Sequence, residues 1–134
     1  MPSVKTKRIF DSFALLVYLK KEARFEKVKN LLSEKDPQIF MNDINVGEVY
    51  YILAREGGMD AADFFSQIIF PSLPIHRVEN SFQDVIEAAK IKAEFAISYT
   101  DCFAAMTVKK ENAFLLTGDP DFRKIENLIE IEWL

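Results

Sequence analysis

Cysteine and histidine are almost absent from this sequence of 134 residues, which contains one of each. Cys102 alone excludes an internal disulfide and is typical of a reducing compartment, so we expect a cytoplasmic protein. A zinc site needs several cysteine or histidine ligands, and Cys102 and His76 are too few to build one. No apolar run approaches the ~20 residues that span a bilayer, and no signal-peptide apolar region follows the N-terminus, so we expect no membrane partner.

Basic residues are also in the minority. The 17 lysines and arginines are outnumbered by 21 acidic residues, which gives a net charge of −4. A general attraction to nucleic acid is therefore not expected, and a function on RNA or DNA would need local basic residues and bridging metal ions. The hydrophobic content of 49% is typical of a globular protein. The length predicts one domain, residues 1–134, that buries a core without disulfides or zinc.

Apolar runs alternate with amphipathic segments along the chain. This alternation predicts the α/β class, as a single domain with a central, mostly parallel β-sheet flanked by helices on both faces. We expect strands at 8–10, 39–41, 75–78, 113–116 and 128–134, the last one at an edge of the sheet. We expect helices at 12–20, 24–32, 43–55, 60–69, 81–95 and 99–110. Pro71 is expected to end the fourth helix.

Five acidic residues fall where the expected strands end or the following helices begin: Asp11, Glu48, Asp101, Asp119 and Asp121. In an open α/β fold, sites form beyond the carboxyl ends of parallel strands, so we expect these side chains at one edge of the sheet. Carboxylates gathered there would repel one another unless a cation neutralised them. Mg²⁺ and Mn²⁺ prefer oxygen ligands and can activate water for attack on a phosphodiester. The pattern predicts a divalent-metal phosphodiesterase.

Each acid also has a purely structural interpretation. Asp11, Asp101 and Asp119 stand at spacings typical of helix caps and capping boxes. Glu48 is harder to explain in this way, because an acid within an apolar stripe needs a partner. It shares a helical face with three apolar residues, Ile44, Tyr51 and Ile52.

The acids lie in four ordered segments, IFDSFALL at 9–16, NVGEV at 45–49, YTDCFAA at 99–105 and LLTGDPDF at 115–122. The order and content of these segments resemble the PIN domain, especially the short VapC-like toxin ribonucleases of prokaryotic toxin–antitoxin pairs. The Thr-Gly-Asp-x-Asp-Phe string, with an Asp-x-x-Ala-Ala segment shortly before it, is the most specific part. The resemblance covers nearly the whole chain.

The resemblance implies a catalytic set of four acids: Asp11, Glu48, Asp101 and Asp119. It implies that Mg²⁺ or Mn²⁺ is held by Asp11, Asp101 and Asp119, with Asp121 binding a second ion or anchoring the loop. Glu48 would hold or orient the attacking water. Two hydroxyl residues match positions that support such a site: Ser12 and Thr117. The chain departs from the family at Asn45, where many relatives have Thr or Ser, and at Cys102, often Ala; we expect both to bear on substrate preference.

The resemblance also implies an RNA substrate, a homodimer and a small antitoxin that holds the enzyme inactive. Arg123 and Lys124 are the basic residues nearest the acidic loop and could contact RNA phosphates. Three alternatives remain: a housekeeping PIN nuclease of RNA maturation, a PIN fold used only as a scaffold, and a receiver-like regulatory module. A receiver needs paired acids early in the chain and a late Lys, where this chain has Asp11 alone and Thr117-Gly118. The intact set of acids counts against the scaffold.

Overall fold

A computed structural model of the protein describes residues 6–134, so the first five residues of the expected domain lie outside the description. The strands are β1 Arg8–Phe10, β2 Ile39–Asn42, β3 His76–Val78, β4 Phe114–Thr117 and β5 Ile131–Trp133. Their order across the sheet is β3-β2-β1-β4-β5, and all four neighbouring pairs are parallel. The expected parallel sheet is confirmed, with β5 at one edge.

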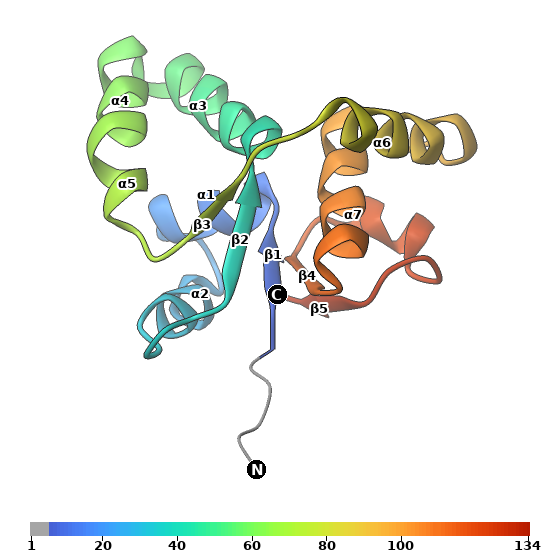
Figure 1. The fold of residues 1–134 in the computed structure, drawn as a ribbon. Helices are drawn as coiled ribbons and strands as arrows, with labels where there is room; N and C mark the ends of the chain where they lie inside the picture. The colour runs from blue at the N-terminus through green and yellow to red at the C-terminus, as the bar shows by residue number, and fades with distance from the viewer. Residues whose placement is uncertain (1–5) are drawn as a thin grey trace.

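Helices cover both faces of this sheet (Figure 1). One layer contains α1 (Ser12–Leu19), α2 (Phe25–Leu32), α3 (Asp43–Gly57), α4 (Met59–Phe64), the π-helical turn η1 (Phe65–Ile69) and α5 (Phe70–Ser72). The other layer contains α6 (Phe82–Glu94), α7 (Tyr99–Glu111) and the 3₁₀ helix η2 (Pro120–Ile125). Within residues 6–134, no helix has the length and apolarity needed to cross a membrane.

Each face of the sheet has its own apolar core, because successive residues of a strand point to opposite faces. In β1, Ile9 packs in the core beneath α6 and α7, whereas Phe10 packs in the core beneath α1 and α2. Leu115 and Leu116 of β4 divide in the same way. All four side chains are fully buried. A sheet covered on both sides explains why its strands read as apolar runs.

The main differences from the expected elements lie in two helical segments. The helix predicted over 60–69 begins at Met59, passes through the π-helical turn and continues to Ser72. The helical segment therefore ends three residues later than the predicted end at Ile69, one residue after Pro71. Leu73, which follows it, is extended. The 3₁₀ helix η2 was not expected as a separate element.

The order of the strands reverses at the centre of the sheet. From β1 the chain proceeds outward to β2 and β3, whereas β4 and β5 lie on the other side of β1. Ligand sites in open α/β sheets form beyond the carboxyl ends of the strands at such a reversal. Asp11 directly follows β1, and Asp119 follows β4 after one intervening residue. Two of the predicted site acids therefore flank the reversal point.

A buried amide network joins α3 to α7. Asn42, at the end of β2, caps α3 by accepting a hydrogen bond from the Asn45 backbone N–H at 2.9 Å. The Asn42 Nδ2 lies 2.9–3.2 Å from three acceptors: Asn45 Oδ1, Thr107 Oγ1 and Phe103 O. Asn45 in turn donates from Nδ2 to the Thr100 carbonyl at 3.0 Å. Since α3 and α7 both carry predicted site residues, this network sets how those residues lie relative to each other.

Replacing Asn42 with alanine removes the cap of α3 and leaves buried partners without a donor. We expect Asn42→Ala to lower the free energy of unfolding by on the order of 2–3 kcal/mol, measured by urea denaturation. Asn30→Ala, at an exposed position of α2, is the matched control and should change stability by less than about 0.5 kcal/mol. Equal stability of the two variants would show that the amide network does not hold α3 to α7.

Candidate metal centre and active site

Asp11 is buried at the carboxyl end of β1. Its Oδ1 accepts a hydrogen bond from the Ala14 backbone N–H at 2.9 Å, which caps α1, and its Oδ2 accepts one from the Thr117 hydroxyl at 2.5 Å. Burial raises the pKa of Asp11 to about 7, although both hydrogen bonds favour the charged form. The negative charges of Asp101 and Asp119 raise this pKa further. Asp11 is therefore both a helix cap and a member of the acidic site.

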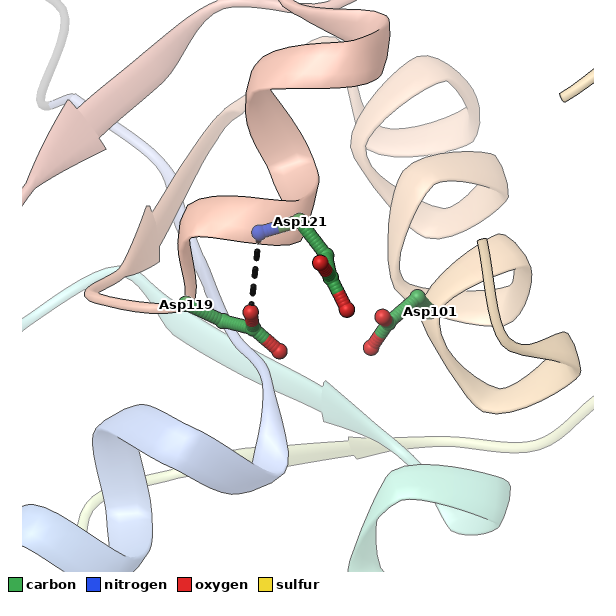
Figure 2. Close-up of side chains that lie close together, drawn as sticks. All are labelled: Asp101, Asp119 and Asp121. Carbon is green, nitrogen blue, oxygen red and sulfur yellow. Dashed lines mark hydrogen bonds between the residues drawn. The ribbon is translucent and has the colours of Figure 1, made fainter. Parts of the chain in front are cut away.

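Three further acids converge at the same edge of the sheet: Asp101, Asp119 and Asp121 (Figure 2). One carboxylate oxygen of each lies within 4.8 Å of the other two. Asp101 is buried in the first turn of α7, where the Ser98 hydroxyl caps the helix by accepting the Asp101 backbone N–H. Asp119 is half-buried and Asp121 is exposed. The cluster thus extends from the protein interior to solvent, and a ligand can reach it from outside.

Thr117 connects Asp11 to this cluster. Its hydroxyl donates to Asp11 and accepts the backbone N–H of Asp119 at 3.0 Å. Asp119 then caps η2, because its Oδ1 accepts the Asp121 backbone N–H at 2.9 Å. Thr117 therefore contacts two of the predicted acids. Asp119 is a helix cap, and its role in the site stays a prediction.

Glu48 is held by hydroxyl groups from neighbouring helices. Its Oε1 accepts from Ser12 at 2.5 Å and its Oε2 accepts from Thr100 at 2.9 Å. The Tyr51 hydroxyl lies 3.5 Å from Oε2. The apolar stripe around Glu48 does not enter the core, because Ile44 and Tyr51 are both exposed. Glu48 therefore lies near enough to the acidic cluster for its charge to act on Asp101. Ser12 contacts it by a hydrogen bond, and the supporting role of Ser12 stays a prediction.

The negative charge of the site is not balanced by the chain itself. Within residues 6–134, none of the five predicted acids forms an ion pair. Burial raises the pKa of Asp101 to about 6, helped by the charge of Asp119 and opposed by the hydrogen bond with Ser98, with smaller increases from the charges of Glu48 and Asp121. A group of carboxylate oxygens with unbalanced charge fits Mg²⁺ or Mn²⁺, which prefer such ligands.

The two basic residues predicted to contact substrate lie on η2, directly after the acidic loop. The Arg123 guanidinium lies 4.9 Å from the centre of the Trp133 ring, and Lys124 Nζ donates to the Ala96 carbonyl at 3.0 Å. Both side chains are exposed. These contacts order the side chains, and their role toward RNA stays a prediction.

The sequence analysis did not foresee the contacts of three residues at the site. Thr100 and Tyr51 contact Glu48, and Asn45 joins α3 to α7. A hydroxyl beside Asp101 was a signal that could have drawn attention to Thr100. No local pattern points to Asn45, because the carbonyl that it contacts lies 55 residues away in the chain. Both departures from the family pattern, Asn45 and Cys102, are buried.

The family model of the PIN domain matches residues 8–128, a stretch that contains all five acids. The chain belongs to the PIN-domain family. The resemblance seen in the sequence motifs is therefore confirmed. No curated protein matches the sequence.

Several solved structures share this fold. VapC20 from Mycobacterium tuberculosis, a sarcin–ricin loop cleaving toxin, is 19% identical with a TM-score of 0.73, over 87% of this chain and 93% of that one. DNA-bound VapBC from Salmonella typhimurium is 16% identical with a TM-score of 0.73, over 96% and 98%. FitAcB from Neisseria gonorrhoeae is 17% identical with a TM-score of 0.70, over 92% and 95%. At these identities the likeness establishes the fold.

The raised pKa values of Asp11 and Asp101 predict how pH acts on the metal-free protein. Between pH 5 and 8 the folded protein retains protons that the unfolded chain has released, so its free energy of unfolding should fall as pH rises toward and through about 7. Asp11→Asn removes the group with the larger pKa shift, so the free energy of unfolding of this variant should fall less between pH 5 and pH 8. Urea denaturation in EDTA at pH 5 and pH 8 measures the effect. Asp60→Asn replaces an exposed acid of α4 and is the control. Its free energy of unfolding should fall between the two pH values as that of the unmodified protein does.

An Asp11→Asn variant that loses as much stability between the two pH values as the Asp60→Asn control would contradict this assignment. Metal binding has the opposite dependence on pH, because the carboxylates must be deprotonated to bind a cation. Affinity for Mn²⁺ should therefore rise over the range in which the metal-free protein loses stability.

Proposed function

We propose that the protein is a Mg²⁺- or Mn²⁺-dependent endoribonuclease that hydrolyses RNA phosphodiester bonds as the toxin of a type II toxin–antitoxin pair in the cytoplasm. The observation that carries this proposal is the uncompensated cluster of Asp101, Asp119 and Asp121 at the reversal point of the sheet, in a chain of the PIN-domain family. Similarity to VapC20, a toxin that cleaves the sarcin–ricin loop, supports RNA as the substrate. Similarity to VapBC from Salmonella typhimurium supports the antitoxin.

In this mechanism Asp11, Asp101 and Asp119 would hold the cation directly or through water, and the exposed Asp121 would anchor the loop or bind a second cation. When bound, the cation supplies a Lewis acid that activates water and neutralises charge on the phosphate. Glu48 orients the attacking water, because its carboxylate is fixed by Ser12 and Thr100 rather than by a cationic side chain.

The ribonuclease activity can be tested on a mixed RNA pool with Mg²⁺, with Mn²⁺ and with EDTA. We expect cleavage with either cation and none with EDTA. Asp101→Asn should lower the cleavage rate by at least about a hundredfold, because it removes a carboxylate from the centre of the cluster while keeping its shape. Asp60→Asn is the matched control and should cleave as the unmodified protein does.

Full activity of Asp101→Asn, or undiminished cleavage in EDTA, would contradict the metal-dependent assignment. Folding of both variants is checked by circular dichroism and thermal melting. Mn²⁺ titration followed by electron paramagnetic resonance then shows whether a loss of activity coincides with a loss of bound metal.

We also propose that the protein forms a homodimer, and exposed apolar side chains on α4 and η1 support this. Phe64 and Ile68 lie about one turn apart at the junction of α4 and η1, and Met59 lies at the start of α4. All three are more than half exposed, whereas the neighbouring Phe65 is fully buried in the core. Clustered exposed apolar residues are typical of protein-contact surfaces. We assign this patch, Met59, Phe64 and Ile68, to the contact between two copies of the chain.

A double substitution in this patch tests the dimer. Phe64→Ser/Ile68→Ser should change the molar mass in solution from that of a dimer to that of a monomer, because it removes apolar area that the contact would bury. Light scattering coupled to size exclusion measures the mass. Phe82→Ser replaces another exposed phenylalanine, at the start of α6, and should leave the dimer intact. An unmodified protein that is monomeric at micromolar concentration contradicts the assignment.

A further inference from the structure

Three exposed aromatic rings border the acidic site. They are Phe13, Tyr51 and Tyr99, with 38%, 42% and 44% of their surfaces exposed. The Tyr51 hydroxyl lies 3.5 Å from Glu48, Phe13 lies against Gly118 next to Asp119, and Tyr99 is the first residue of α7, two residues before Asp101. These positions place exposed aromatic surface at the carboxyl edge of the sheet, where the acids also lie.

Phe13 rests on the loop that carries Asp119. A Cβ atom built on Gly118 would lie 2.5 Å from the Phe13 Cε1, so the ring occupies the space that any larger residue at 118 would need. Glycine therefore lets the ring lie directly on the backbone between Thr117 and Asp119. The remainder of the ring is exposed at the edge of the acidic site.

Tyr99 is positioned from the opposite layer of the fold. It begins α7, and its ring meets the ring of Phe103 edge to face, with centroids 5.1 Å apart and planes at 70°. Phe103 is buried, so it provides a fixed support for the exposed Tyr99. Because α1 and α7 cover opposite faces of the sheet, Phe13 and Tyr99 approach the carboxyl edge from two sides.

Tyr51 lies beneath the positive charge of Arg55. The Arg55 guanidinium lies 4.9 Å from the centre of the Tyr51 ring, one helical turn farther along α3. Arg55 is exposed. An aromatic ring with a guanidinium over it offers both a stacking surface and a cation for a phosphate.

We propose that Phe13, Tyr51 and Tyr99 form a rim that stacks on unpaired bases of the RNA strand whose phosphate enters the acidic site. This inference rests on the proposed ribonuclease function. The physical reason is the charge of the protein: with a net charge of −4 and five acids at the site, general electrostatic attraction cannot supply the affinity for RNA. Stacking on aromatic rings does not depend on protein charge and accepts any base. Bases must be unpaired to stack in this way, so the rim selects single-stranded segments.

The rim is tested by binding of a fluorescein-labelled 12-nucleotide oligoadenylate in Mg²⁺, in an Asp101→Asn background that does not cleave it. Phe13→Leu and Tyr99→Leu keep apolar volume but remove the ring, and each should weaken binding by about fivefold or more. Phe13→Tyr and Tyr99→Phe keep a ring and should bind as the background does. Phe114→Leu is the matched control: Phe114 is 39% exposed but begins β4, at the end of the strand opposite the acids.

An abasic ribose-phosphate chain of the same length separates stacking from a structural effect. The leucine variants should bind this chain as tightly as the background does, because no base remains to stack. With Asp101 restored, their Mn²⁺ affinity should match that of the unmodified protein. If Phe13→Leu and Tyr99→Leu bind oligoadenylate as tightly as Phe114→Leu does, the proposed stacking role of the rim is wrong, and the proposed ribonuclease function is not affected. If the unmodified protein neither binds nor cleaves RNA with Mg²⁺ or Mn²⁺, the ribonuclease function and the rim both fail.

Discussion

The repulsion between carboxylates that the fold brings to one edge of the sheet is the constraint on which the site depends. One carboxylate oxygen each of Asp101, Asp119 and Asp121 lies within 4.8 Å of the other two. The charge of Glu48 raises the pKa of Asp101, and the charges of Asp101 and Asp119 raise the pKa of Asp11. Within residues 6–134, the chain provides no ion pair for any of them. In the metal-free protein, burial together with this repulsion raises the pKa of Asp11 to about 7 and that of Asp101 to about 6, and a divalent cation can neutralise the charge that remains.

The rest of the fold opposes this repulsion with neutral hydrogen bonds. The Thr117 hydroxyl and a backbone N–H of α1 donate hydrogen bonds to Asp11. The hydroxyls of Ser12 and Thr100 donate hydrogen bonds to Glu48. The buried Asn42 and Asn45 donate hydrogen bonds to Thr107 and Thr100 of α7, and these hydrogen bonds join the start of α3 to α7. Neutral donors hold the carboxylates in place without adding positive charge, so the cluster keeps the negative charge that a cation would balance. A lysine or arginine in the same positions would stabilise the metal-free protein and lower its affinity for the metal.

Several acids serve the fold and the site at once. Asp11 caps α1 and Asp119 caps η2, and Asp101 stands in the first turn of a helix capped by Ser98. The cap interpretation and the metal interpretation of these residues are therefore not alternatives. A parallel strand that ends at a helix places the helix N-terminus at the carboxyl edge of the sheet, where a capping carboxylate is also close to the ligand site.

The sequence by itself determined the α/β class, the parallel order of elements and the five acids, because apolar runs, turn residues and short motifs are local patterns. Local pattern placed the end of the fourth helix at Ile69, whereas the π-helical turn over Phe65–Ile69 is followed by further helix to Ser72. Only the tertiary structure decided which acids converge and what holds them. The hydrogen bonds from Ser12 to Glu48, Thr100 to Glu48 and Thr117 to Asp11 span 36, 52 and 106 residues. Distances of this kind follow from the packing of helices on a sheet, and no segment of the chain carries that information alone.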